Sequence, residues 1–129
     1  MTKVLYLIRG IPGSGKTTLG KQILKGTNGV LVSADDYFTS SDGSYNFDPT
    51  KICEAHRSCQ VRSNDAMSKG ITPVVVANVF HKRLHMQPYL EYAEKHGYHV
   101  VEICVSSGFK NVHGCPEDKV RIFKDTFEY

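Results

Sequence analysis

The sequence predicts an α/β fold: a three-layer sandwich in which a mainly parallel sheet of four or five strands lies between helices. Three observations predict it. Strand and helix signals alternate along the whole 129-residue chain, which is the order typical of a parallel sheet covered by helices. Residues 4–8 are uninterrupted apolar residues, as in a central strand buried on both faces. A glycine-rich turn follows them directly and opens a helix at about residues 16–25.

The following elements are predicted from local signals. Gly26 ends the first helix, and an Asn-Gly turn leads into a second strand at residues 30–33. The Ser-, Asp- and Gly-rich residues 39–45 predict a surface loop. A long helix then begins with Asp48 as N-cap and Pro49 in the first helical position, and Gly70 stops it.

The second half of the chain continues the alternation. Residues 73–77 predict a third strand and residues 99–105 a fourth. The helix between them ends at His96, and Pro88 either kinks it or marks its true start. A last helix opens at residues 116–118. Helical spacing predicts inward faces made of Ile52, Ala55, Cys59 and Ala66; of Leu84, Tyr89, Leu90 and Ala93; and of Val120, Phe123 and Phe127.

Composition predicts one intracellular domain that spans residues 1–129. The net charge of +3 is modest and is not massed in one block, so charge alone does not indicate nucleic-acid binding. No apolar run approaches the roughly 20 residues of a membrane span, and the first ten residues lack the features of a signal peptide. Four cysteines without a Cys-x-x-Cys pair predict reduced thiols in the cytoplasm or nucleus rather than a secreted protein.

The glycine-rich turn matches G-x-x-x-x-G-K-[ST] in full. Glycines let the backbone wrap around phosphates, and the helix N-terminus adds partial positive charge. Lys16 is expected to reach the β- and γ-phosphates and Thr17 to hold Mg²⁺. The guanine-reading tetrapeptide Asn-Lys-x-Asp is absent from the sequence, which favours ATP. The predicted nucleotide-binding residues are Gly10, Ile11, Pro12, Gly13, Ser14, Gly15, Lys16, Thr17 and Thr18.

Two acids, Asp35 and Asp36, follow the second predicted strand. Ligands of open α/β sheets bind beyond the carboxyl ends of the strands. An acid at that place could take a proton from an attacking hydroxyl while its neighbour orients substrate or a metal-bound water. Alternatively, the pair only caps a loop, and position by itself favours neither interpretation.

Residues 9–19, Arg-Gly-Ile-Pro-Gly-Ser-Gly-Lys-Thr-Thr-Leu, and 33–38, Ser-Ala-Asp-Asp-Tyr-Phe, resemble the P-loop kinase domain of polynucleotide 5′-hydroxyl kinases. The chain is most similar to the P-loop domains of Nedd-four-binding protein two and its like-proteins. The resemblance implies transfer of the ATP γ-phosphate to a hydroxyl, often a nucleic-acid 5′-OH. It implies Asp35 as general base, with a supporting, substrate-side role for Asp36. The further matching segments are 45–49, 54–56, 69–76, 86–91, 96–98 and 111–114.

Two departures from the family pattern bear on catalysis. Where the family usually has Asp-Asn-Thr-Asn after the third strand, residues 77–80 are Ala-Asn-Val-Phe, and Asn78 alone matches. The segment that carries lid arginines in relatives is short, and Lys110 and Arg121 are the nearest replacements on the substrate side; surface charges of this kind are more often simply solvated. Two hypotheses therefore stay open: a kinase that uses ATP and Mg²⁺, or an ATP-binding regulatory module without phosphotransfer.

Overall fold

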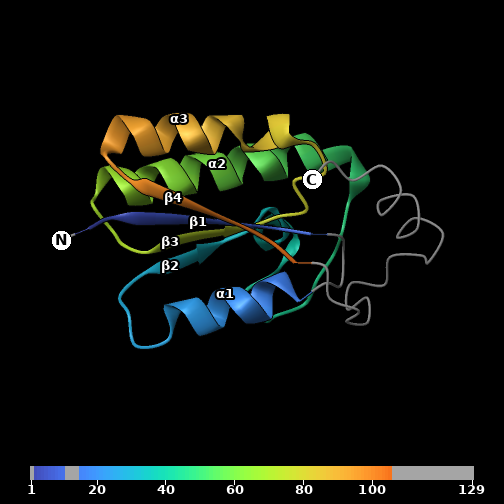
Figure 1. The fold of residues 1–129 in the computed structure, drawn as a ribbon. Coiled ribbons are helices and arrows are strands. Elements are labelled where there is room, and N and C mark those ends of the chain that lie inside the picture. The colour runs from blue at the N-terminus through green and yellow to red at the C-terminus, as the bar shows by residue number, and fades with distance from the viewer. Residues whose placement is uncertain (1, 11–14, 106–129) are drawn as a thin grey trace.

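The computed structural model describes residues 2–10 and 15–105. Four parallel strands form one sheet in the order β2-β3-β1-β4. Helix α1 covers one face of the sheet, and α2 and α3 lie side by side on the other (Figure 1). The predicted three-layer α/β fold is therefore confirmed. The strands are β1 (Val4–Arg9), β2 (Val30–Val32), β3 (Val74–Ala77) and β4 (His99–Cys104), and the α-helices are α1 (Lys16–Leu24), α2 (Ile52–Ser68) and α3 (Gln87–His96).

The centre of the sheet is made of β1 and β3, which pair from Leu5 opposite Val74 to Ile8 opposite Ala77. All four residues of β3 are buried, as expected for a strand covered on both faces. The close approach of neighbouring segments depends on Gly29 before β2, because a Cβ atom there would lie 2.2 Å from the Pro73 carbonyl oxygen. The parallel pairings of β1 with β3 and of β2 with β3 bring the carboxyl ends of all three strands to the same end of the sheet.

The structure also contains three 3₁₀ turns, η1 (Ala34–Phe38), η2 (Pro49–Lys51) and η3 (Arg83–Met86), of which η2 and η3 lie in segments predicted as helix. Asp48 caps η2 by accepting from the Thr50 amide at 3.0 Å, so the long helical segment starts where predicted but its first turn is 3₁₀. Pro88 lies in the first turn of α3. It therefore marks the start of that helix rather than a kink.

Two of the core predictions, for Ile52 and Leu84, are wrong. Ile52 is 41% exposed, because it is the first residue of α2 and helical side chains lean toward the N-terminus, past the end of the helix. Leu84 is 76% exposed and Met86 is buried in its place, since this segment is the 3₁₀ turn η3 and lies outside the register of α3. The remaining helix predictions for α2 and α3 are buried or packed on the core: Ala55, Cys59, Ala66, Tyr89, Leu90 and Ala93.

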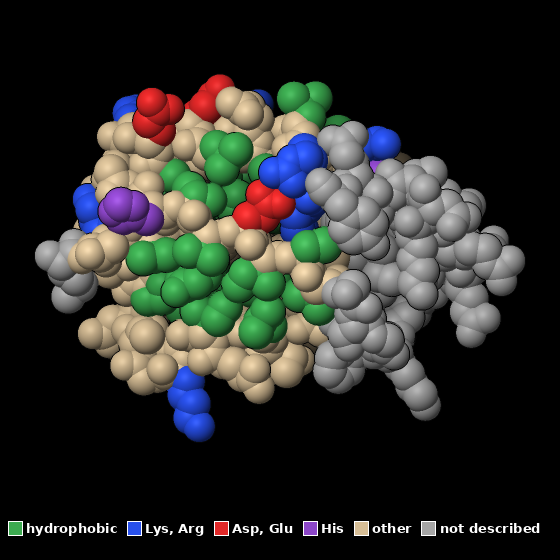
Figure 2. Space-filling view, viewed as in Figure 1, with side chains coloured by type: hydrophobic (Ala, Val, Ile, Leu, Met, Phe, Trp, Pro, Cys, Tyr) green, Lys and Arg blue, Asp and Glu red, His purple; other side chains and the backbone are tan. Residues whose placement is uncertain are grey.

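Strand β4 lies at the edge of the described sheet. Val100 and Val101 are 38% and 39% exposed, and Figure 2 shows hydrophobic side chains gathered on this side of the molecule. The predicted helix from residue 116 and its inward residues Val120, Phe123 and Phe127 lie outside the described residues. Within residues 2–10 and 15–105, no helix has the length and apolarity that crossing a membrane requires.

Candidate active site

The two ends of the glycine-rich turn lie at the carboxyl end of β1 and at the start of α1. Gly10 is buried, and its amide donates to the Val79 carbonyl at 3.2 Å. Gly15 is the N-cap of α1 with φ 93°, a left-handed conformation that suits glycine. Gly15 has no side chain and therefore gives α1 no side-chain cap, and the start of this helix carries the partial positive charge that favours an anion. The predicted binding residues Ile11, Pro12, Gly13 and Ser14 lie outside the described residues.

Lys16, the first residue of α1, folds back toward the turn. Its Nζ donates to the Gly10 carbonyl oxygen at 2.9 Å. Burial lowers the pKa of Lys16 to about 8, and the charge of Asp35 opposes that shift. The ammonium is thus close enough to Asp35 for their charges to interact, and it is partly stripped of water. A buried ammonium of this kind gains much from an incoming polyphosphate.

The hydroxyl groups of Thr17 and Thr18 belong to the first turn of α1, and both residues are exposed. A hydroxyl oxygen beside a phosphate-binding turn fits Mg²⁺, which usually takes one or two protein oxygens and completes its shell with water and substrate phosphates. The described residues contain no group of three or more His, Cys, Asp or Glu side chains arranged for a metal.

Asp35 and Asp36 lie in η1, directly after β2, but their carboxylates have different partners. Asp36 closes a capping box: its Oδ2 accepts from the Ser33 amide at 3.0 Å, while Ser33 Oγ accepts from Asp35 N at 3.2 Å. The same Asp36 oxygen forms an ion pair with Arg62 at 3.0 Å. The Asp36 carboxylate therefore caps η1, as the alternative interpretation of the acid pair expected. A contact between Asp36 and substrate would have to compete with its bonds to Ser33 and Arg62.

The Asp35 carboxylate accepts a hydrogen bond from a distant loop residue. The Tyr45 hydroxyl donates to Asp35 Oδ1 at 3.2 Å, and an isolated bridge between Thr39 and Tyr45 turns the intervening loop back toward η1. Burial, followed by the charge of Asp35, raises the pKa of Tyr45 to about 12, so this hydroxyl remains a donor at neutral pH. Reasoning from the sequence missed Tyr45 as a site residue, although it opens one of the segments that match the family.

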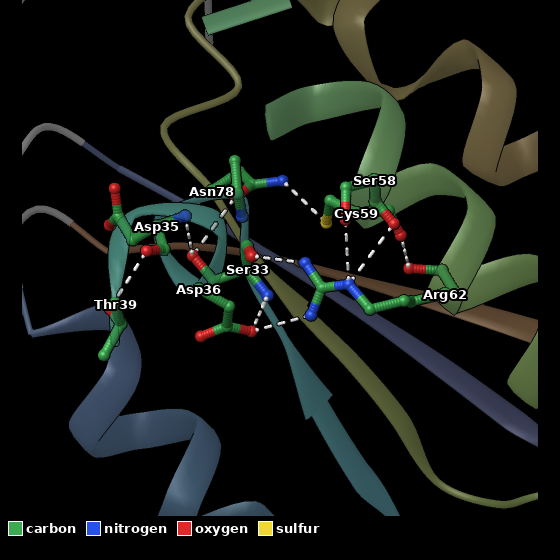
Figure 3. Close-up of polar contacts among 10 residues, drawn as sticks. Ser33, Asp35, Asp36, Thr39, Ser58, Cys59, Arg62 and Asn78 are labelled. Carbon is green, nitrogen blue, oxygen red and sulfur yellow. Dashed lines mark hydrogen bonds and ion pairs between the residues drawn. The ribbon is translucent and has the colours of Figure 1, made fainter. Parts of the chain in front are cut away.

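Arg62 of α2 holds η1 from one side, as Figure 3 shows. Its guanidinium donates to the Ser33 carbonyl and to Asp36 Oδ2, both at 3.0 Å. From the sequence, an arginine here is more often a solvated surface charge, with contact to a substrate phosphate as the rarer alternative. The structure instead gives the Arg62 guanidinium three protein partners, Ser33 and Asp36 of the η1 region and Ser58 of its own helix, so its positive charge is engaged in supporting η1.

At the end of β3, Ala77 stands where the family pattern has an aspartate. Ala77 is 3% exposed and packs with Ile8 and Val75 on the side of the sheet that α1 covers. This apolar cluster leaves no carboxylate at the position where relatives have one. Lys110 and Arg121, predicted on the substrate side, lie outside the described residues.

The segment after β3 is also held from the far side of the sheet by Arg9, the last residue of β1. Its guanidinium is buried and donates to the Phe80 carbonyl at 2.9 Å and to Glu102 of β4 at 3.3 Å. Arg83 contacts the same Glu102 carboxylate at 2.8 Å. These bonds tie the ends of β1, β3 and β4 together behind the glycine-rich turn.

Comparison with known proteins agrees with this geometry. An AAA domain family model matches residues 5–108. Human NEDD4-binding protein 2 is 35% identical over 127 residues, which are 91% of this chain but only 7% of that protein. A structure of the Pnkp1/Rnl/Hen1 complex superimposes with a TM-score of 0.64 at 16% identity, and the match covers 89% of this chain and 40% of that chain. A second structure similar to this chain is that of the Pnkp1/Rnl/Hen1 RNA repair complex.

A gluconokinase from Sinorhizobium meliloti superimposes with a TM-score of 0.60 at 13% identity, covering 98% of this chain and 75% of that chain. At such low identities the superpositions concern the fold alone. The family itself rests on the matched residues 5–108 and on the identity with NEDD4-binding protein 2. The chain belongs to the AAA domain family and is homologous to a small part of NEDD4-binding protein 2.

Proposed function

We propose that this chain is an ATP-dependent phosphotransferase that moves the γ-phosphate to a hydroxyl acceptor, with a polynucleotide 5′-OH as the first acceptor to test. The observation that carries the proposal is the position of Lys16 and Asp35 at the same end of the sheet. Lys16 follows β1 through the glycine-rich turn and bonds the Gly10 carbonyl at 2.9 Å, Asp35 follows β2 in η1, and the Asp35 charge acts on the Lys16 ammonium. A phosphate-binding cation and a proton acceptor so close together suit transfer between a phosphoryl group and a hydroxyl.

The proposed step uses the residues as follows. Asp35 takes the proton of the acceptor hydroxyl as its oxygen attacks the γ-phosphorus, and the bond between that phosphorus and the β,γ-bridging oxygen breaks to release ADP. The Lys16 ammonium and the first amides of α1 stabilise the negative charge on the phosphoryl oxygens. Thr17 would hold Mg²⁺, which neutralises charge on the β- and γ-phosphates when bound. The Tyr45 hydroxyl keeps the Asp35 carboxylate oriented.

The choice of a polynucleotide acceptor has separate support. The resemblance of residues 33–38 to polynucleotide 5′-hydroxyl kinases covers the segment that holds Asp35, and the Pnkp1/Rnl/Hen1 RNA repair complex shares the fold. An intracellular location, in the cytoplasm or nucleus, is part of the same proposal, because ATP and nucleic-acid ends occur together there.

A second candidate function is ATP binding without phosphotransfer, in a regulatory or interaction domain. The buried Ala77 favours it, because no carboxylate stands at the end of β3 to support a metal ion. This candidate keeps the nucleotide-binding roles of Lys16 and Thr17 and removes only the role of Asp35 as a base.

Label transfer from γ-³²P-ATP to a 5′-OH oligonucleotide, to nucleosides and to small alcohols tests the proposal, with ATP binding measured in parallel by calorimetry. We expect labelled oligonucleotide, and we expect Asp35→Asn to reduce the rate by about 10²–10⁴-fold, the usual contribution of a general base. Asp42→Asn is the matched control, since Asp42 is an exposed loop residue whose carboxylate accepts from the amide and hydroxyl of Ser44. ATP binding without transfer to any acceptor would favour the second candidate. An unchanged rate in Asp35→Asn would reject Asp35 as the base.

A further inference from the structure

Asn78, the first residue after β3, is 5% exposed and makes side-chain hydrogen bonds to two other elements. Its Oδ1 accepts from the Ala34 amide at 2.8 Å and from Ser33 Oγ at 3.4 Å. Its Nδ2 donates to the Cys59 sulfur of α2 at 3.5 Å (Figure 3). A backbone amide only donates, so the Asn78 oxygen must face Ala34. The orientation of this side chain is therefore determined by its partners.

The backbone around Asn78 reaches the phosphate-binding side of the site. The Asn78 amide donates to the Ile8 carbonyl at 3.2 Å, and the next carbonyl, that of Val79, accepts from the Gly10 amide at 3.2 Å. Gly10 is the first residue of the glycine-rich turn. Two consecutive residues, Asn78 and Val79, therefore connect the start of that turn with the start of η1, which carries Asp35.

The start of η1 needs acceptors for its first amides, because a 3₁₀ turn of five residues satisfies few of them itself. Asp36 accepts from the Ser33 amide and Ser33 Oγ accepts from the Asp35 amide, so these two bonds are internal to residues 33–36. The Ala34 amide instead bonds Asn78, which directly follows the neighbouring strand β3. Internal bonds shape the turn, whereas the bond to Asn78 sets where the turn sits on the sheet.

Arg62 also links η1 to another element, but in a different environment. Its side chain is 38% exposed, so water can replace its bonds at small cost. The Asn78 amide group lies among buried atoms, where a lost acceptor leaves the Ala34 amide unsatisfied. Of these two contacts, the one from Asn78 is the one that solvent cannot replace.

We propose that Asn78 is a positioning residue for phosphotransfer, holding Asp35 at a set place relative to the phosphate-binding turn. The inference rests on the proposed function, because it assigns Asn78 a role only through Asp35. In catalysis a displacement of about 1 Å can cost about 10²-fold in rate. Asn78 therefore acts on the turnover number and leaves the binding of nucleotide, which depends on the turn and α1, unchanged.

Three variants test this role. Asn78→Ala removes the acceptor for Ala34, Asn78→Asp keeps an oxygen in its place, and Asn64→Ala is the matched control. The Asn64 oxygen bonds His96 at 2.9 Å and joins α2 to the end of α3, so its loss removes a comparable side-chain bond away from η1. Hydrogen exchange of the Ala34 amide, followed by NMR, reports on the bond to Asn78 without requiring any catalysis.

We expect Asn78→Ala to lose protection of the Ala34 amide and to lower kcat by about 10- to 100-fold, with the ATP dissociation constant within about twofold of the unaltered chain. Asn78→Asp should retain the protection and recover part of the rate. Asn64→Ala should leave kcat unchanged. In an Asp35→Asn background, Asn78→Ala should cost less than about threefold, because the group that it positions no longer acts as a base.

The outcomes separate this inference from the proposed function. If the unaltered chain transfers no phosphate to any acceptor, both fall together. If it transfers phosphate and Asn78→Ala exposes the Ala34 amide while kcat stays within about twofold, the inference alone is rejected. It is also rejected if Asn78→Ala costs the same factor with and without Asp35, since a general loss of structure would act in both backgrounds.

Discussion

Nucleotide binding should take up protons near pH 8, through Lys16. Burial lowers the pKa of this lysine to about 8 in the free chain. Bound phosphates should return it to about 10.5 or higher, the ordinary range of a charged lysine. Titration with these two values gives an uptake of about 0.1 proton at pH 7, about 0.5 at pH 8 and about 0.9 at pH 9.

The sign of the pH dependence follows from the same shift. The protonated ammonium binds the polyphosphate, so affinity must fall as pH rises through the pKa of the free chain. Between pH 7 and pH 9 the ATP dissociation constant should increase about tenfold, equivalent to about 1.4 kcal/mol. Below pH 7 the lysine is already charged, and this contribution should level off.

Isothermal titration calorimetry with a non-hydrolysable ATP analogue measures the uptake directly. At one pH, the observed heat varies with the ionisation enthalpy of the buffer in proportion to the protons exchanged. The control is Lys16→Arg, because a guanidinium stays charged throughout this pH range. An equal proton uptake at pH 8 in the unaltered chain and in Lys16→Arg would refute the reasoning. So would an affinity that does not change between pH 7 and pH 9.

Three further predictions concern separate contacts. Tyr45→Phe should lower the transfer rate by about tenfold, the value of one hydrogen bond to a charged group, with unchanged ATP affinity; a full rate would show that Asp35 needs no help from this loop. Glu102→Gln should lower the free energy of unfolding in urea by about 1–3 kcal/mol. The loss is smaller than for a fully buried ion pair, because the Glu102 side chain is 33% exposed. Equal stability would mean that the Arg9 guanidinium does not need the Glu102 charge. Gly29→Ala should lower the free energy of unfolding by about 1–3 kcal/mol, because the added methyl group would overpack against the Pro73 carbonyl oxygen. An unchanged urea midpoint of unfolding would show that the backbone around this contact relaxes freely.

Most elements of the fold could be predicted from the sequence because each has a strong local signal. The apolar runs of β1 and β3, Pro88 in the first turn of α3, and Gly97 at its left-handed end all act over a few residues. The two wrong core residues lie where helical periodicity does not apply: Leu84 in a 3₁₀ turn and Ile52 at a helix end. Period alone assigns a face only inside a regular helix.

The roles of the site residues stay predictions. The G-x-x-x-x-G-K-[ST] octet predicts a phosphate-binding turn because its chemistry uses adjacent backbone amides. Position in the sequence left open whether Asp35 and Asp36 serve catalysis or cap a loop, and only the family resemblance separated their roles. Their difference comes from partners more than nine positions away: Tyr45 on Asp35, and Arg62 on Asp36. Contacts of that kind carry no fixed spacing in the sequence.

Hydrophobic period, capping and glycine geometry are local properties of the chain, so the sequence predicts the α/β class, the order of the elements and a phosphate-binding turn. The tertiary structure shows that the Asp36 carboxylate closes the cap of η1 while the Asp35 carboxylate accepts from Tyr45, and that Asn78 after β3 bonds η1 after the neighbouring strand β2. The physical reason is that side-chain hydrogen bonds in a buried site depend on how strands are ordered in the sheet, and β3 lies between β2 and β1 although it follows both in the chain.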